Sequence, residues 1–240
     1  MKEYKLPKRK QPFFSMVKSV IKPFFRVDEV INTAGDFPDQ CIIVSNHSAK
    51  SGPMAMEMYF PKFTVKWGAH EMLEGYSQRF HYLRDVFYMR KQFMGKTKAS
   101  IKAFFEAIVS PMPYKGMKIL PSYPDARLVY TLNCSMKALD ANMGVVIFPE
   151  DSNDGYKEEP TKFFAGFVLL AERYYRATGI DVPVVPTYYH KKQRKIIIGK
   201  PEFVQKLKKL GMKRDEIAEH FRKAVNSLFR KYIKKDVKES

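Results

Sequence analysis

Residues 41–53, CIIVSNHSAKSGP, decide the fold of this 240-residue chain. The apolar, β-branched run Cys41-Ile42-Ile43-Val44 is followed by polar residues, which predicts a short buried strand. Ser51-Gly52-Pro53 predicts the start of a helix, with Ser51 as the N-cap and a proline in the first turn. His47 would therefore lie between the end of a strand and the free backbone amides of a helix N-terminus. This arrangement favours acyl or phosphate chemistry, with histidine as a base.

Two further buried-strand patterns carry prolines near their carboxyl ends. Residues 144–150 read GVVIFPE, and residues 181–186 read DVPVVP. The order Asn-His-Ser, then Phe-Pro-Glu about a hundred residues later, then Val-Pro-Val-Val-Pro resembles the phospholipid and glycerol acyltransferase superfamily, which includes the lysophosphatidic acid acyltransferases. The resemblance covers residues 25–186, and it includes Gly35-Asp36-Phe37-Pro38 and Phe63-Thr64-Val65-Lys66.

The chain departs from this family pattern at positions that concern the chemistry. The family's first motif is a histidine followed five residues later by an aspartate, and the position five residues after His47 is Gly52. The third motif continues Phe-Pro-Glu with Gly-Thr-Arg, whereas this chain has Asp151-Ser152-Asn153. The arginine expected to hold a phosphate is therefore missing. The second motif has a distorted counterpart in residues 117–127, and the fourth matches in full.

The resemblance implies transfer of a fatty acyl group, in phospholipid biosynthesis, from acyl-CoA or acyl-carrier protein to the hydroxyl of a glycerol phosphate or lysophospholipid. His47 would act as the general base, and amides at the following helix start would stabilise the oxyanion. No bound cofactor is expected, and no metal site, because His70 and His81 lack metal-ligand spacing. The expected substrate-binding residues are Asn46, Ser48, Lys50, Lys66, Phe148, Pro149, Glu150, Asp151, Ser152 and Lys162.

Gly52 removes the carboxylate that would fix the tautomer of His47. Loss of the equivalent aspartate in a serine protease lowers kcat by about 10⁴. One alternative is that Glu57, Asp85 or Asp151 supports His47, in which case the pKa of the imidazole should be raised. The other is a non-catalytic lipid- or membrane-binding protein that keeps the acyltransferase fold.

Alternating strands and helices with buried apolar strands predict an α/β fold, independently of the resemblance. The resemblance specifies an acyltransferase-type αβ sandwich, in which a central mixed sheet is flanked by helices. We expect one such domain in residues 27–201, with a helical insertion at about residues 70–115 that covers an acyl-chain tunnel, lies on the membrane or is purely structural. Residues 202–240 are expected to be a basic helical region that packs on the same domain. Helices are predicted over residues 97–111, 128–142, 161–175 and 214–232, and a last strand over residues 196–201.

The formal net charge of +18 comes from the two ends of the chain. Residues 1–26 contain 8 basic and 1 acidic residues, residues 190–240 contain 17 basic and 6 acidic residues, and residues 27–189 are balanced. The ends are therefore expected to meet a polyanionic surface, either anionic lipid headgroups or nucleic acid, unless the lysines serve only solubility. We expect no nucleic acid, because no recognition motif is present.

Residues 13–22, FFSMVKSVIK, follow a basic cluster at residues 8–10 and predict a short amphipathic helix that ends at Pro23. An aromatic-rich apolar face flanked by lysines is typical of a helix that lies in a membrane interface, although the same face could pack on its own domain. We favour a membrane-associating segment over residues 1–26. The residues expected on the apolar face are Phe13, Phe14, Met16, Val17, Val20 and Ile21.

Cys41 and Cys134 lie in apolar or helical patterns with no secretion signal before them, so both are expected to be reduced, buried thiols. No apolar run reaches about 18 residues, so no transmembrane helix is predicted. We therefore expect a cytoplasmic protein that binds peripherally to the anionic inner face of the membrane.

Overall fold

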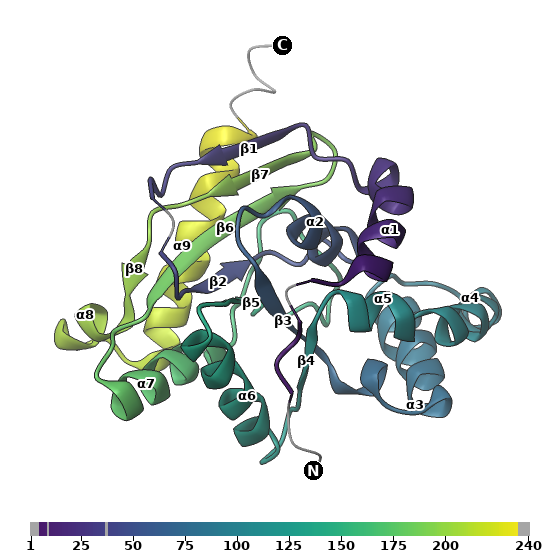
Figure 1. The fold of residues 1–240 in the computed structure, drawn as a ribbon. Coiled ribbons are helices and arrows are strands. Elements are labelled where there is room, and N and C mark those ends of the chain that lie inside the picture. The colour runs from purple at the N-terminus through teal and green to yellow at the C-terminus, as the bar shows by residue number, and fades with distance from the viewer. Residues whose placement is uncertain (1–4, 9, 37, 235–240) are drawn as a thin grey trace.

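An eight-stranded sheet forms the centre of the computed structural model, which describes residues 5–8, 10–36 and 38–234 (Figure 1). Seven strands follow the order β1-β7-β6-β2-β5-β3-β4, and β8 pairs with β6. All pairs are parallel except β6 with β7 and β6 with β8, so the predicted α/β class with a central mixed sheet is confirmed. The strands are β1 Glu29–Asn32, β2 Ile42–Ser45, β3 Thr64–Ala69, β4 Ile119–Ser122, β5 Gly144–Ile147, β6 Pro183–His190, β7 Lys195–Ile198 and β8 Glu202–Phe203.

Strands β2 and β5 lie side by side in the middle of the sheet, and all of their residues are buried. Continuous apolar, β-branched runs suit this position because helices cover both faces of a parallel sheet. The register pairs Ile43 with Val146 and Val44 with Ile147. Since parallel strands end at the same edge, the polar residues after β2 and those after β5 are brought together there.

Helices cover both faces of the sheet. On one face, α6 (Leu128–Asp140), α7 (Gly166–Thr178), α8 (Val204–Lys209) and α9 (Arg214–Tyr232) share the larger hydrophobic core with the inward side chains of β2, β3 and β5. On the other face, α2 (Ser51–Tyr59) contributes Ala55 and Met56 to a second core with Ile43, Val146 and Val185. The sheet is therefore the middle layer between two sets of helices.

Between β3 and β4, the chain forms a separate helical unit with its own core. It comprises η2 (His70–Leu73), α3 (Tyr76–His81), the π-helix η3 (Tyr82–Arg90), α4 (Lys96–Val109) and α5 (Pro111–Gly116). Ala99, Ala103 and Ala107 of α4 pack against η3, which contributes Leu83 and Phe87. The larger apolar residues of this helix, Ile101, Phe104, Phe105 and Ile108, are exposed.

At the N-terminus, the predicted helix is α1 (Pro12–Ile21), continued by the 3-10 helix η1 (Lys22–Phe25). The six apolar residues of α1 lie on one broad face, as predicted, but the domain covers only one side of that face. Phe14 is buried against Gly116, while Val17 and Ile21 are partly buried in the same cluster. The residues on the other side are exposed, by 62% for Phe13, 61% for Met16, 69% for Val20 and 82% for Phe24.

Several boundaries differ from those predicted. The helix expected over residues 161–175 begins at Gly166, because Phe163 forms a β-bridge with Glu150, and the last strand ends at Ile198.

Cys41 and Cys134 are buried and free. Within the described part of the chain, no helix is both long and apolar enough to cross a membrane. The N-terminal and C-terminal segments expected over residues 1–26 and 202–240 include residues 1–4, 9 and 235–240, which lie outside the described residues, as does Phe37 of the resemblance.

Candidate active site

The carboxyl ends of β2 and β5 bring His47 and the Phe148-Pro149-Glu150 segment into contact. The backbone N–H of His47 donates a hydrogen bond to Oε2 of Glu150 at 2.9 Å. The centroid of the imidazole ring lies 4.9 Å from that of Phe148 and 5.1 Å from that of Tyr156. Two motifs that are about a hundred residues apart in the sequence therefore form one site.

Asn46 attaches the end of β2 to β6. Its side-chain amide donates to the carbonyl of Tyr189 at 3.0 Å, and its Oδ1 accepts the N–H of the same residue at 2.8 Å. Asn46 is buried, and both ends of its amide are used in these bonds. The structure therefore gives this expected substrate-binding residue a positioning contact, which fixes the loop that carries His47.

The loop after His47 has an unusual backbone conformation. Ser48 and Ala49 have φ angles of 46° and 51°, in the left-handed region that residues with a Cβ rarely adopt. Such conformations persist only where the surroundings hold them, and they are frequent at functional sites. Helix α2 then begins at Ser51 with Lys50 at the N-cap position, so the expectation of Ser51 as N-cap is wrong.

Gly52 packs directly against the backbone of His47. A Cβ atom built on Gly52 would lie 2.0 Å from the carbonyl oxygen of His47, far inside van der Waals contact. An aspartate at this position, as in the acyltransferase motif, would require the loop or α2 to move. The backbone in this structure therefore leaves no room for a side chain at position 52.

None of the three carboxylates considered as replacements contacts the imidazole of His47 in the structure. Glu57 is held by lysines on α1, β3 and the segment before β4. Asp85 pairs with the neighbouring Arg84, and Oδ1 of Asp151 accepts hydrogen bonds from Asn153. His47 thus lacks an orienting carboxylate among the residues that the structure describes.

The environment of His47 favours the neutral imidazole. Burial lowers the pKa of His47 to about 4, and the positive charge of Lys91 contributes in the same direction. Nδ1 is buried and has no hydrogen-bond partner within the described residues. A carboxylate that supported His47 would raise its pKa, whereas the pKa in this structure is lowered. A neutral imidazole can accept a proton, but a pKa this low makes it a weak base at neutral pH.

Glu150 is 7% exposed, and burial raises the pKa of its carboxyl group. The carboxyl group also lies close enough to Lys157 for a long hydrogen bond of 3.5 Å from its backbone N–H. Because its other oxygen already accepts the His47 amide, Glu150 stabilises the loop geometry of the site. The hydrogen bond between Glu150 and the His47 amide thus holds the His47 loop against the Phe148–Glu150 segment.

An apolar cavity of about 830 Å³ extends from His47. This volume lies within the range of small-molecule binding sites. One wall comes from α1 and η1 through Val17, Ile21 and Phe25. The opposite wall comes from α4 and the start of α5, through Ile101, Phe105, Ile108, Val109 and Met112. The cavity thus connects the imidazole with the two helices whose outer apolar side chains are exposed.

Lys50 crosses the cavity near His47 and links α2 to the helical unit. Its ammonium group donates to the hydroxyl of Tyr88 at 2.9 Å and pairs with Glu106 of α4. It also lies 4.9 Å from the ring centroid of Phe87. Lys50, the cation expected to bind a substrate phosphate, therefore lines the same cavity as His47. In the structure its ammonium group is paired with the carboxylate of Glu106.

The other expected binding residues are placed as follows. Pro149 accepts the N–H of Phe164 at 2.8 Å, and the N–H of Asp151 donates to the carbonyl of Lys162 at 3.0 Å. Ser152 is buried, whereas Ser48 is partly exposed beside His47. The side chain of Lys162 is exposed. Lys66 lies apart from this group, in a polar cluster at the far end of α2.

Comparison with models of known protein families gives no match, and comparison with curated protein sequences gives none either.

Two residues of the site were not expected from the sequence. Tyr156 packs against the ring of His47 from the loop after β5, and Lys91 follows η3, 44 residues after His47. Burial lowers the pKa of Lys91, while the charges of Glu150 and Asp151 oppose this effect. Neither residue belongs to a recognisable motif, and the only sequence signal was that both lie in segments rich in aromatic and charged residues.

Proposed function

We propose that this protein transfers a fatty acyl group from an acyl thioester to the hydroxyl of a glycerol phosphate or lysophospholipid at a membrane surface. The observation that carries the proposal is that His47 lines an apolar cavity of about 830 Å³. An extended apolar ligand gains free energy in proportion to the area it buries. The acyl chain would lie between α1 and α4, with its thioester beside the imidazole.

In this mechanism, neutral His47 accepts the proton of the acceptor hydroxyl while that oxygen attacks the thioester carbonyl carbon. The carbon–sulfur bond then breaks, and the leaving thiolate takes the proton from the imidazolium. Backbone amides at the start of α2 are the nearest group of donors for the oxyanion. Lys91, whose charge acts on His47, and Lys50 are the available cations for a substrate phosphate.

A peripheral membrane position is supported by the outer surfaces of the two helices that line the cavity. Phe13, Met16, Val20 and Phe24 are exposed on α1 and η1, and Phe104 is 49% exposed on α4. Contiguous exposed apolar side chains mark interaction sites, and Lys96, Lys98 and Lys102 on α4 add positive charge suited to anionic headgroups. Lipid could then enter the cavity directly from the bilayer.

The proposal is tested by acyl transfer with the purified full chain on anionic vesicles, using lysophosphatidate or glycerol phosphate as acceptor and acyl-CoA or acyl-carrier protein as donor. His47→Gln should abolish turnover. The control is His190→Gln, because His190 is also buried and has a pKa lowered by burial, but it packs against Phe229. Equal turnover in the wild type and His47→Gln would reject His47 as the base.

A second candidate is a lipid-binding protein without catalysis, and the unpartnered Nδ1 of His47 favours it. A base without an orienting carboxylate loses much of its catalytic advantage, whereas the cavity would still hold an acyl chain. Native mass spectrometry after incubation with fatty acid or lysophospholipid separates the two functions. Stoichiometric binding, together with no turnover for any donor and acceptor pair, would support the second candidate and exclude the first.

A further inference from the structure

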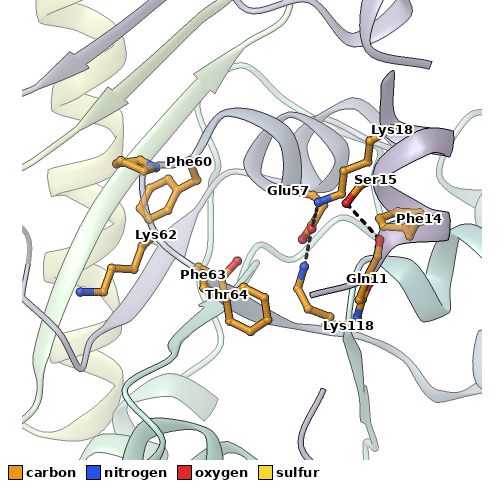
Figure 2. Close-up of a pocket in the computed structure, with 11 residues that line it drawn as sticks. Gln11, Phe14, Ser15, Lys18, Glu57, Phe60, Lys62, Phe63, Thr64 and Lys118 are labelled. Carbon is orange, nitrogen blue, oxygen red and sulfur yellow. Dashed lines mark hydrogen bonds and ion pairs between the residues drawn. The ribbon is translucent and has the colours of Figure 1, made fainter. Parts of the chain in front are cut away.

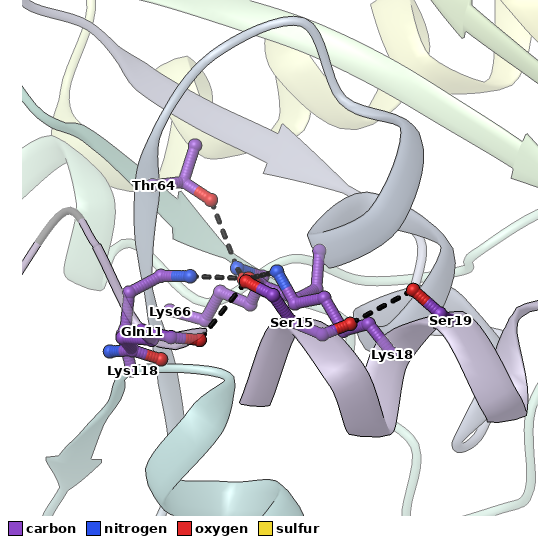
Figure 3. A network of polar contacts seen from close by, with 8 residues as sticks. Gln11, Ser15, Lys18, Ser19, Thr64, Lys66 and Lys118 are labelled. Carbon is purple, nitrogen blue, oxygen red and sulfur yellow. Dashed lines mark hydrogen bonds and ion pairs between the residues drawn. The ribbon is translucent and has the colours of Figure 1, made fainter. Parts of the chain in front are cut away.

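Four charged side chains from separate parts of the chain meet at the end of α2 that lies away from His47. Glu57, in the last turns of α2, pairs with Lys18 of α1, Lys66 of β3 and Lys118, which precedes β4. Figure 2 shows Lys18 and Lys118 directed toward Glu57, and Figure 3 shows Lys66 approaching the same point from the sheet. Three ammonium groups thus surround one carboxylate, which leaves an excess of two positive charges when all are ionised.

These charges are largely removed from water. The side chain of Lys66 is 0% exposed, that of Glu57 2% and that of Lys118 5%, whereas Lys18 is 28% exposed. Burying a charge without a counter-charge is costly, so the excess of lysines is the unusual feature. In particular, Lys66 reaches only Glu57 and the hydroxyl of Thr64, at 2.9 Å, within the described residues.

The pKa directions agree with an excess of positive charge. Burial by itself would raise the pKa of Glu57, but the charges of Lys66 and Lys118 lower it to about 2. Burial lowers the pKa of Lys66 and, together with the charge of Lys66, lowers the pKa of Lys118 to about 8. The carboxylate therefore stays ionised, and the lysines are the groups whose charge the fold disfavours.

A cavity of about 410 Å³ adjoins the cluster, and both Lys18 and Lys118 line it (Figure 2). An ammonium group has three N–H donors. In the described residues, each of these two lysines makes one hydrogen bond, to Glu57. Lys62 also lines the cavity and pairs with Asp39 at 2.8 Å. Glu57 lines the cavity as well, so its wall combines unused N–H donors with more lysines than carboxylates.

We propose that this cavity binds a phosphate monoester, whose oxygens accept hydrogen bonds from Lys18 and Lys118 and whose charge balances the three lysines. A phosphate monoester carries about two negative charges at neutral pH and has three acceptor oxygens, and lysine binds phosphate as a point charge. The phosphate could belong to a soluble metabolite or to the headgroup of a lipid, because α1 forms one wall of the cavity and also carries the exposed apolar residues.

This site is separate from the one at His47. Lys66 is level with Val146 and Ile43 in the sheet, two strands away from β2, and His47 lies four residues beyond Ile43. With ordinary strand spacing and rise, the Cα atoms of Lys66 and His47 are roughly 15 Å apart. The proposed phosphate site therefore does not depend on acyl transfer, and either could exist without the other.

The test measures binding to the purified full chain by calorimetry and by the shift in Tm, with inorganic phosphate and glycerol phosphate as soluble probes. Phosphate should stabilise the wild type, and Lys118→Gln should weaken binding by about tenfold or more, the size expected for a charged hydrogen bond. Lys18→Gln should act in the same direction. The matched control is Lys206→Gln, an exposed lysine on α8, on the opposite side of the molecule from α1 (Figure 1).

A further arm compares phosphatidylcholine vesicles that contain phosphatidate with vesicles that contain phosphatidylglycerol at equal surface charge. Preference for phosphatidate that is lost in Lys118→Gln, with no response to the soluble probes, would identify a lipid headgroup as the source of the phosphate. Response to the soluble probes would identify a free phosphate monoester. The proposal is overturned if no probe binds, or if Lys118→Gln and Lys206→Gln bind the probes equally well. Because Glu57 keeps two lysine partners in each single variant, both variants are expected to fold.

Discussion

Replacing Glu57 by glutamine should destabilise the protein far more than replacing any one of its lysine partners. In the wild type, Glu57 is the carboxylate on which Lys18, Lys66 and Lys118 converge. Glu57→Gln leaves three ammonium groups together with no counter-charge, and Lys66 has no access to solvent. Lys118→Gln removes a positive charge from a cluster that has two in excess, and Glu57 stays paired.

The magnitude follows from the burial of these groups. Removing one partner of a buried ion pair costs about 3–5 kcal/mol, because the remaining charge is left unpaired in a poorly polarisable environment. A native protein has only about 5–15 kcal/mol of stability, so this cost is a large fraction of the total. For a chain of 150–250 residues, it corresponds to a decrease in Tm of roughly 6–20 °C. The loss for Lys118→Gln should stay below about 1 kcal/mol, since surplus charge is removed.

Urea unfolding followed by far-UV circular dichroism and by the fluorescence of Trp67 measures both variants. Trp67 is the only tryptophan and follows Lys66 in β3, so its emission reports on this part of the sheet. The loss in free energy of unfolding caused by Glu57→Gln should also become smaller as the pH rises from 7 to 9. In that range the unfolded chain binds more protons than the native one, whose buried lysines have lowered pKa values, so stability rises with pH. Equal destabilisation by Glu57→Gln and Lys118→Gln, or a loss below about 1 kcal/mol for Glu57→Gln, would refute this account.

Three more outcomes follow from the structure. Gly52→Ala should lower the free energy of unfolding by about 1–3 kcal/mol, because the added Cβ would collide with the His47 carbonyl. Urea unfolding measures this loss, and the control is Gly95→Ala, where nothing lies within 4 Å of the added Cβ. The pKa of His47 should be about 4 in an NMR titration. The free energy of unfolding should then fall by up to about 1.4 kcal/mol per pH unit between pH 6.5 and 4, because the unfolded state binds more protons than the native state in this range. A measured pKa at or above 6.5 would contradict that burial effect. Val20→Glu should weaken binding to anionic vesicles in a flotation assay at least tenfold. Leu210→Glu should not, because Leu210 is comparably exposed but caps α8, which lies on the other side of the molecule from α1 (Figure 1).

The elements with strong local patterns were predicted well. The apolar runs of β2 and β5 indicated buried strands, and the periodic apolar residues of α9 indicated a helix over residues 214–232, which are its observed bounds. The predicted start of α7 is five residues too early, because Phe163, which precedes the helix, pairs with Glu150 in a bridge that the local pattern does not reveal.

At the site, the sequence pointed to His47 and to the Phe148–Glu150 segment, and parallel pairing of β2 with β5 brings them together. The partners of His47 could not be foreseen. Tyr156 and Lys91 reach the imidazole from a loop and from the end of the helical unit. The absence of an aspartate at position 52 was visible in the sequence, whereas the close packing that prevents one was visible only in the structure.

The sequence by itself determined several strands and helices, among them β2, β5, α2 and α9, because periodicity, turn residues and β-branching act over a few neighbouring residues. It also determined that α1 and α4 have apolar surfaces to cover. Only the tertiary structure decided which side of each helix is covered, with Phe14 buried and Phe13 exposed, since a hydrophobic pattern does not say what packs against it. Likewise, Glu57 and Lys66, expected near His47, form a separate cluster with Lys18 and Lys118. Coulomb energy depends on distance in space, and the sheet register sets that distance for residues far apart in the chain.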